Sequence, residues 1–361
     1  MSDSSLGRKV GRVVARQHRK SGADEIAVSV FCEKTGETVH AAAGQQVGGP
    51  VDAQTPFFLA STTKLFATAL VLQLRSEGLL ELDEPIARYL GAATLSGLHR
   101  IGGRDFSGEI TVRHLLSHTS GLPDYFEEKR RDGSRLATSL LAGTDARWSL
   151  DDVLAATRHD LAPHFRPGEA RKALYSDTNH QLLGGVIESV TDQPLAQLVK
   201  VRIADRLALT QTYLFDADTA STRPAVLQLR NSASRPAIPQ AIESTRLDGG
   251  GVSSSAELLE FIRAFFDGRL FPAEDVPALF DWRAVFFPLQ YGVGVMRLKL
   301  PWFFSPFAPQ PELVGHSGIS GAFAFWSPEK RVFLSGTVNQ LANRSLPYRF
   351  MLQVLAAVEP A

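Results

Sequence analysis

The sequence predicts an α+β protein, an α/β/α sandwich whose antiparallel sheet is built from both ends of the chain. Residues 26–32 (IAVSVFC) and 38–43 read as a strand pair joined by a turn, and residues 321–326 and 331–338 read as a second pair. Helical patterns fill the stretch between the two pairs. One sheet flanked by helices, with an all-helical domain inserted, is the economical arrangement of these elements.

The chain of 361 residues agrees with two domains, because one domain usually has about 150 residues. We expect residues 1–82 and 248–361 to form the domain with the sheet, and residues 83–247 to form the mainly helical inserted domain. The hydrophobic content of 44% and the charged content of 21% are typical of a globular protein.

The first element predicted is a basic amphipathic helix at residues 6–20, with Leu6, Val10, Val13 and Val14 on one face. The same composition would suit a transit peptide. We favour a packed helix, because a strand follows it directly. No apolar run typical of a secretory signal precedes this segment, so we expect a cytoplasmic location.

The remaining helices follow in order along the chain. Residues 65–74 are apolar almost all round, which is typical of a buried helix, and Gly78 ends it. A capping box at residues 254–257 opens a helix that runs to residue 267. Further helices are predicted at residues 112–117, 151–157, 180–190, 195–207 and 348–358.

Charge and cysteine content exclude several classes of function. The chain has 38 Lys and Arg residues and 38 Asp and Glu residues, so no bulk positive field attracts nucleic acid or an anionic membrane. No apolar run reaches the roughly 18 residues of a membrane span. Cys32 is the one cysteine, so an intrachain disulfide is impossible. His114 and His118 have the spacing of a metal pair but no obvious third ligand nearby, and we favour a structural role for them.

Ser61 and Lys64 carry the chemistry that we predict. They form an S-x-x-K segment at the start of the buried helix, so their side chains lie on one face, with Cβ atoms roughly 5–6 Å apart. A serine becomes a good nucleophile when a neighbouring base takes its proton. Burial would lower the pKa of Lys64 and free its lone pair. Taken alone, S-x-x-K also occurs by chance at exposed helix starts.

Two later segments suit this pair. Tyr175 precedes Ser176 and Asp177, and a tyrosine close to a lysine ammonium would have a lowered pKa and could serve as a base. The alternative is a buried tyrosine bonded to the backbone. His316, Ser317 and Gly318 lie just before a predicted strand, where a glycine permits close approach of a substrate. The alternative there is a turn with an incidental histidine.

Together these segments resemble the motifs of the serine β-lactamase and penicillin-binding-protein superfamily, in its class C β-lactamase-like branch. That branch includes family VIII carboxylesterases, D-aminopeptidases and D-alanyl-D-alanine carboxypeptidases. S-x-x-K matches residues 61–64, Y-x-N aligns with residues 175–177, and K/H-[ST]-G matches residues 316–318. Residues 115–123 (LLSHTSGLP) and 248–254 (DGGGVSS) also resemble family segments, and the likeness covers nearly the whole chain.

The resemblance implies a serine hydrolase that is acylated on Ser61, with Lys64 and Tyr175 sharing the proton transfers. It implies an oxyanion hole from the backbone N–H groups of Ser61 and Ile319, and a site between the sheet and the helical domain. It implies no metal and no organic cofactor, and a small ester or amide as the partner.

Asp177 stands where the family usually has Asn, and ionised Asp accepts hydrogen bonds but donates none. Asp177 could pair with Lys64, keep it protonated and shift the role of base toward Tyr175. His316 supplies less fixed positive charge than the lysine of related motifs. Both features favour a neutral ester or a substrate with a free amine over a β-lactam carboxylate.

We therefore expect a carboxylesterase on small esters. The alternatives are a D-amino-acid amidase or aminopeptidase, a D-alanyl-D-alanine carboxypeptidase, a weak β-lactamase, an acyltransferase, and a non-catalytic binding protein with this fold. The aromatic segment 281–307 suits an apolar pocket and core packing equally well.

Overall fold

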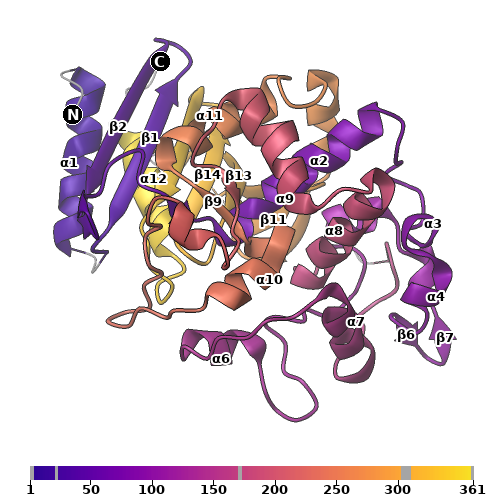
Figure 1. Ribbon diagram of the computed structural model, residues 1–361. Helices are drawn as coiled ribbons and strands as arrows, with labels where there is room; N and C mark the ends of the chain where they lie inside the picture. The colour runs from indigo at the N-terminus through magenta and orange to yellow at the C-terminus, as the bar shows by residue number, and fades with distance from the viewer. Residues whose placement is uncertain (1–3, 21–22, 170–172, 302–309, 359–361) are drawn as a thin grey trace.

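A computed structural model describes residues 4–20, 23–169, 173–301 and 310–358. Its centre is an eight-stranded antiparallel sheet (Figure 1). In spatial order the strands are β10 (Arg283–Phe286), β11 (Leu289–Tyr291), β12 (Met296–Leu298), β13 (Leu313–Ser317), β14 (Ala322–Ser327), β15 (Val332–Thr337), β1 (Ile26–Cys32) and β2 (Glu37–Ala43).

The two ends of the chain meet in this sheet. Strand β1 pairs with β2 on one side and with β15 on the other, with Val30 opposite both Val39 and Leu334. The hairpin β14–β15 completes the join. The predicted α+β fold and its antiparallel sheet made from both termini are therefore confirmed.

Helices cover both faces of the sheet. Helices α1 (Ser5–Lys20) and α12 (Leu346–Ala357) lie on one face, and α11 (Ser255–Phe266) lies on the other (Figure 1). Because side chains alternate along a strand, Val28 and Val30 of β1 pack in the core beneath α1 and α12. The side chain of Ala27 points to the opposite face of β1 and packs in the core on the α11 side. This is the three-layer arrangement that the sequence predicts.

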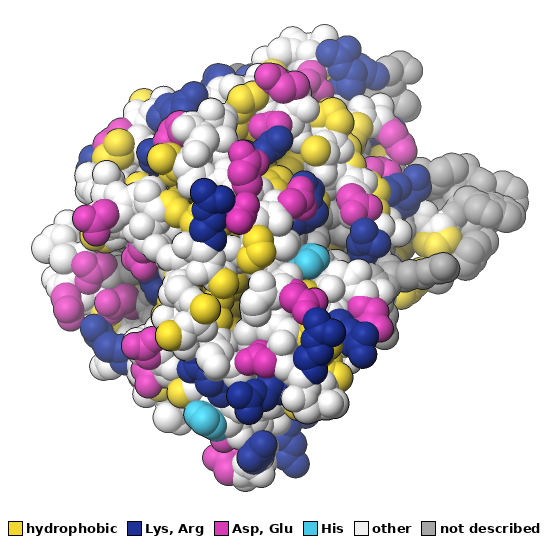
Figure 2. All heavy atoms as spheres, turned by 90° about the vertical axis from the view of Figure 1, so that its right-hand side faces the viewer, with side chains coloured by type: hydrophobic (Ala, Val, Ile, Leu, Met, Phe, Trp, Pro, Cys, Tyr) yellow, Lys and Arg dark blue, Asp and Glu magenta, His cyan; other side chains and the backbone are white. Residues whose placement is uncertain are grey.

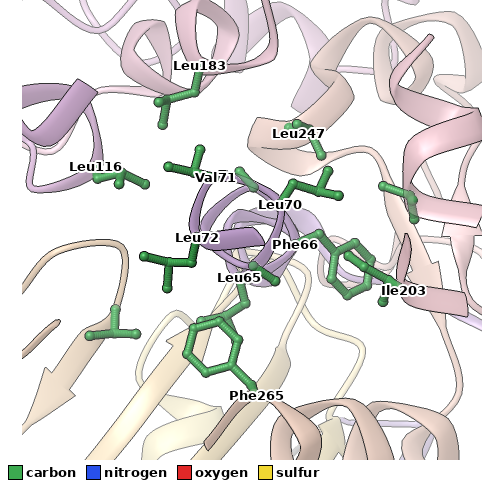
Figure 3. Packing of buried hydrophobic residues seen from close by; sticks show 14 of the residues in the cluster. Leu65, Phe66, Leu70, Val71, Leu72, Leu116, Leu183, Ile203, Leu247 and Phe265 are labelled. Atoms are coloured by element: carbon green, nitrogen blue, oxygen red, sulfur yellow. The ribbon is translucent and has the colours of Figure 1, made fainter. Parts of the chain in front are cut away.

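Helix α2 (Lys64–Ser76) is buried on all sides, and the short 3₁₀ turn η1 (Ala60–Thr63) leads into it. Figure 3 looks along α2 and shows its apolar side chains pointing outward into a continuous core. Full burial of such a side chain stabilises the fold by about 1.5–3 kcal/mol. Helix α2 is therefore a rigid support for the residues at its N-terminal end. The core around it includes Leu65, Phe66, Leu70, Val71, Leu72, Leu116, Leu183, Ile203, Leu247 and Phe265.

The middle of the chain is mainly helical and lies to one side of the sheet (Figure 1). Its helices are α3 (Ala87–Leu90), α4 (Ala92–Leu95), α5 (Val112–Leu116), α6 (Leu136–Leu141), α7 (Leu150–His159), α8 (Asp177–Thr191), α9 (Leu195–Val199) and α10 (Pro239–Gly249). Short strands pair outside the main sheet: β3 (Gln45–Gln46) with β4 (Gly49–Pro50), β6 (Arg100–Ile101) with β7 (Arg104–Asp105), and β9 (Gly251–Ser253) with β5 (Phe57–Phe58) and β8 (Tyr213–Leu214). The domain boundaries at residues 82/83 and 247/248 stay a prediction.

Several local predictions are wrong in detail. Ser254 caps α11 by accepting the N–H of Glu257, but the Glu257 carboxylate completes no capping box. It accepts the N–H groups of Thr210 and Gln211 instead, because those backbone donors lie at the same end of α11. The predicted helix 195–207 ends at Val199 and continues as π-helical and 3₁₀ turns.

The surface shows no area dominated by one charge on the face drawn in Figure 2, where Lys and Arg side chains are mixed with Asp and Glu. This distribution agrees with the equal numbers of acidic and basic residues. No helix among the described residues combines the length and the apolar composition that crossing a bilayer requires.

Candidate active site

Ser61 and Lys64 meet at the junction of η1 and α2. The Lys64 ammonium donates a hydrogen bond to Ser61 Oγ at 3.1 Å, as the i, i+3 spacing predicts. The Lys64 side chain is fully buried, whereas Ser61 lies on the wall of a cavity. A charged amine is costly to bury unless it has partners, so the other contacts of Lys64 decide its state.

Lys64 Nζ has three oxygen neighbours. Besides Ser61 Oγ, it contacts the Asp248 backbone carbonyl at 2.6 Å and Asp177 Oδ1 at 2.6 Å. Asp177 lies in the first turn of α8, and Asp248 lies near the end of α10. Two of these contacts are hydrogen bonds and the third is an ion pair, and an ammonium has three N–H donors and no lone pair. In this arrangement Lys64 is a cation held by Asp177.

Tyr175 lies just before α8 and faces the same serine. The Lys64 ammonium is 5.1 Å from the centre of the Tyr175 ring, and the Ser61 side chain is a hydrogen-bond partner of the phenol. Burial raises the pKa of Tyr175 well above its ordinary value, and the charge of Asp177 raises it further, while the bond with Ser61 lowers it. The predicted lowering of the Tyr175 pKa is therefore wrong. Asp177 compensates the Lys64 charge, and burial dominates.

Two further carboxyl groups surround this pair. Burial raises the pKa of both Asp124 and Asp248 well above the ordinary value, and the charge of Asp177 adds to the effect. Asp124 accepts the N–H groups of Phe126 and Asp177, and Asp248 accepts the Tyr125 hydroxyl at 2.8 Å. Burial thus favours the neutral form of both carboxyls inside a hydrogen-bond network, and Asp177 is the carboxylate that pairs with Lys64.

His316 lies in the fully buried strand β13, behind the cavity wall. Its Nδ1 lies 2.8 Å from the Ser317 carbonyl and its Nε2 lies 3.0 Å from the Tyr291 hydroxyl. Burial lowers the pKa of His316 to about 3, and the positive charge of Lys64 adds to the effect. His316 is therefore a neutral imidazole at ordinary pH, and the third motif supplies no positive charge.

Strand β13 ends against η1 at Gly318. A Cβ atom added there would lie 2.1 Å from the Leu59 carbonyl oxygen, so only glycine permits this approach. The Ser320 hydroxyl donates to the Phe58 carbonyl at 2.7 Å and fixes the following turn. This approach brings Ile319 to the same cavity wall as Ser61.

The cavity beside Ser61 has a volume of about 540 Å³. Its wall includes six of the eight predicted site residues, whereas Lys64 and His316 lie buried behind it. The six are Ser61, Tyr175, Asp177, Ser317, Gly318 and Ile319. Much of the remaining lining is apolar and comes from η1, α6, α10 and β10.

The aromatic segment 281–307 contributes to both pocket and core. Phe286 lines the cavity and is 56% exposed, whereas Tyr291 is fully buried beside His316. Trp302, Phe303, Phe304 and Phe307 lie outside the described residues.

The sequence favoured a structural role for His118, but it connected none of four residues to the site that they shape: His118, Asp124, Asp248 and Tyr291. Two of them lie in segments that were noted only for a structural resemblance, residues 115–123 and 248–254. Asp124 directly follows residues 115–123. Its position next to that segment could have indicated that Asp124 belongs to the site. Among the described residues, no group of three or more His, Cys, Asp or Glu side chains is arranged to hold a metal ion.

Comparison with known proteins decides the family. The profile described as Beta-lactamase matches residues 14–358, which is most of the chain. The chain belongs to the beta-lactamase family.

Solved structures and relatives agree with this assignment. A D-stereospecific amidohydrolase from Streptomyces sp. is 25% identical and superposes with a TM-score of 0.72 over 97% of this chain and 98% of its own. The D-amino acid amidase from Ochrobactrum anthropi SV3 is 21% identical, with a TM-score of 0.79 over 98% and 99% of the two chains, and this shows the shared fold. Penicillin-binding protein 4* of Bacillus subtilis is 27% identical over 46% of this chain and 32% of its own.

The beta-lactamase-family chain spans about a third of the length of the curated relatives it matches. Those relatives therefore support the family, and their activities enter only as candidates.

Proposed function

We propose that this protein is a carboxylesterase that forms an acyl-enzyme on Ser61 and acts on small esters with an apolar acyl group. The hydrogen bond between Lys64 Nζ and Ser61 Oγ, at the wall of a largely apolar cavity, carries this proposal. Ser61 Oγ attacks the ester carbonyl, and the backbone N–H groups of Ser61 and Ile319 receive the developing oxyanion.

Tyr175 acts in this scheme as a proton donor. A phenol with a raised pKa keeps its proton at neutral pH, so it suits protonation of the leaving alkoxide rather than deprotonation of Ser61. In the second half of the reaction Tyr175 orients the water that hydrolyses the acyl-enzyme.

The charges around the cavity favour a substrate without a carboxylate. His316 is neutral, and Lys64 is held by Asp177. Arg344 is the only Lys or Arg side chain among the described residues of the cavity wall, and it is paired with Glu127 at 2.8 Å. A β-lactam or a D-alanyl-D-alanine peptide carries a carboxylate that would find no free cation here.

A second candidate is an amidase that acts on D-amino-acid amides. Glu127 and Asp177 line the cavity wall, and although they are paired with Arg344 and Lys64, either carboxylate could accept a further hydrogen bond from the free ammonium group of such a substrate. The solved structures titled D-stereospecific amidohydrolase and D-amino acid amidase favour this candidate.

The deciding experiment compares wild type with Ser61→Ala. We expect wild type to hydrolyse p-nitrophenyl acetate and butyrate and to be labelled at Ser61 by a fluorophosphonate probe, as mass spectrometry can detect. Ser61→Ala should lose both activities, because no other group replaces the nucleophile. Equal ester hydrolysis in the two proteins would overturn the proposal.

Thr62→Val is the matched control. Thr62 is the next residue in η1, fully buried, and its hydroxyl has no hydrogen-bond partner among the described residues. This variant should keep the wild-type rate. D-Phenylalanine amide and nitrocefin, assayed beside the esters, separate the candidates: faster turnover of the amide supports the amidase, and faster turnover of nitrocefin supports a β-lactamase.

A further inference from the structure

The resting site has no free base next to Ser61. Lys64 donates hydrogen bonds to Ser61 Oγ and to the Asp248 carbonyl, and it forms an ion pair with Asp177. Tyr175 is a buried phenol that keeps its proton. The proton of Ser61 must therefore leave through a group that first takes a proton from Lys64.

Asp177 meets the geometric requirement for that group. Its Oδ1 lies 2.6 Å from Lys64 Nζ in an ion pair, and among the described residues this oxygen accepts no hydrogen bond, so it is open to a proton. The other carboxyl groups nearby are already occupied. Asp124 accepts backbone N–H groups, and Asp248 accepts the Tyr125 hydroxyl and the Gln181 amide. Asp248 contacts Lys64 through its backbone carbonyl and not through its carboxyl group. A backbone amide oxygen is a very weak base.

We propose that Asp177 is the proton acceptor of a Ser61–Lys64–Asp177 relay that activates the serine. The inference rests on the proposed acylation of Ser61 and adds a role for the residue at the position where related proteins carry Asn. In this relay Asp177 acts on Ser61 through Lys64, so it is a positioning and proton-holding residue.

The relay balances in protons and electrons. A proton moves from Lys64 Nζ to Asp177 Oδ1 and leaves a neutral amine beside a neutral acid. The Ser61 O–H proton then moves to this amine while the Oγ–carbon bond forms and the carbonyl π electrons move to oxygen. As the ester bond breaks, Tyr175 protonates the leaving alkoxide and is reprotonated from Lys64. Asp177 finally returns its proton to Lys64, so the net transfer is from Ser61 to the alcohol.

Lys64 and Asp177 form the charged pair of the site, and the other ionisable groups around them are buried. Burial raises the pKa of the neighbouring Asp and Tyr side chains and lowers that of the His side chains, so burial favours the neutral form of each of these groups. The groups that face the pair are Asp124 and Tyr125 before α6, Tyr175 before α8, His180 in α8, Asp248 in α10, His118 after α5, Tyr291 in β11 and His316 in β13.

Asp177→Asn tests the relay through the pH dependence of Ser61 reactivity. The readouts are the rate of fluorophosphonate labelling of Ser61 and kcat/KM for p-nitrophenyl butyrate, each between pH 5 and 10. In wild type we expect both rates to fall on the acid side, because the relay needs a carboxylate that can accept a proton from Lys64. In Asp177→Asn we expect a loss of the order of 10²–10⁴-fold near pH 7, partly recovered at alkaline pH, where hydroxide in the solvent can replace the missing proton acceptor.

Asp124→Asn is the matched control, because an amide oxygen can still accept the N–H groups of Phe126 and Asp177. Asp124→Asn should not change the pH at which the two rates fall on the acid side, whatever its effect on the size of the rates. Circular dichroism and thermal melting confirm that both variants fold. An Asp177→Asn protein with the wild-type pH profile, whether fully active or uniformly slower, overturns the relay but not the acyl-enzyme. Absence of Ser61 labelling in wild type overturns the proposed function itself.

Discussion

His118 holds the chain on both sides of Tyr175. Its carbonyl accepts the Leu174 N–H at 2.9 Å, and its Nδ1 accepts the Ser176 N–H at 3.1 Å. Its ring stacks on the Tyr175 ring with centroids 4.4 Å apart. Because Nδ1 accepts from the backbone, the ring proton of the neutral imidazole lies on Nε2. The phenol that faces Ser61 thus takes its position from a histidine far away in sequence.

Two substitutions separate the hydrogen bond of His118 from its ring. His118 has a φ of 55°, a left-handed value that Asn tolerates better than most residues. His118→Asn keeps an acceptor near Ser176, whereas His118→Ala leaves that buried N–H unpaired. We expect the Ala variant to have a free energy of unfolding lower than the Asn variant by about 1–3 kcal/mol in urea titrations.

Both His118 variants lose the ring stacked on Tyr175, so both should show a lower kcat for p-nitrophenyl butyrate with little change in KM. Equal unfolding free energies in the two variants would show that the Ser176 contact contributes nothing. A wild-type kcat in both would show that the ring does not position Tyr175.

At the scale of elements, the contact between the end of β13 and η1 sets the expected oxyanion hole. Gly318 has no room for a side chain, since the Leu59 carbonyl would lie 2.1 Å from a Cβ atom. Gly318→Ala must therefore push β13 away from η1 and displace the Ile319 N–H. We expect kcat to fall about 10²–10³-fold, which is typical of the loss of one oxyanion donor. Steady-state kinetics with p-nitrophenyl esters measures this.

Gly108→Ala provides the comparison for Gly318→Ala. An added Cβ at Gly108, in η2 (Ser107–Glu109), would meet no atom within 4 Å. This variant should have wild-type kinetics and stability. If Gly318→Ala also kept the wild-type kcat, the oxyanion would not depend on the approach of β13 to η1.

The elements that the sequence predicts are those with a strong local pattern. Strand β1 and helix α2 are long and regular, so their periodicity identifies them, and the S-x-x-K spacing alone brings Ser61 to Lys64. Strands β10, β11 and β12 have only three or four residues each and carry too little alternation to be recognised. Helix α10 was not predicted either, and its path deviates at Arg246, where φ is 48°.

The electrostatics of the site could not be predicted for a different reason. The pKa of Tyr175 depends on its burial and on the distance from Lys64 to Asp177, which are set by the packing of α8 against α2. Sequence spacing contains neither quantity. The possible pairing of Asp177 with Lys64 could be stated from residue types, but its effect on the phenol required the geometry.

For the whole molecule, the buried ionisable groups determine how stability depends on pH. Burial lowers the pKa of His118, His180 and His316, so the unfolded chain binds more protons than the folded one below about pH 6.5. These histidines therefore stabilise the fold less as the pH falls. Burial raises the pKa of Asp124 and Asp248, which has the opposite sign: their contribution is largest at acid pH and decreases as the pH rises above about 4.

His316→Gln isolates one of these contributions. Glutamine never titrates and offers both a donor and an acceptor for Ser317 and Tyr291. His316 has a pKa of about 3 in the folded protein, so between pH 4 and 6 it accounts for up to about 1.4 kcal/mol of unfolding free energy per pH unit. We expect urea titrations of His316→Gln to show a slope of stability against pH that is smaller by this amount. His159→Gln, at the exposed end of α7, should keep the wild-type slope. An unchanged slope in His316→Gln would mean that this imidazole is charged in the folded protein. The site would then contain a positive charge at residues 316–318, and the argument for an ester without a carboxylate would fail.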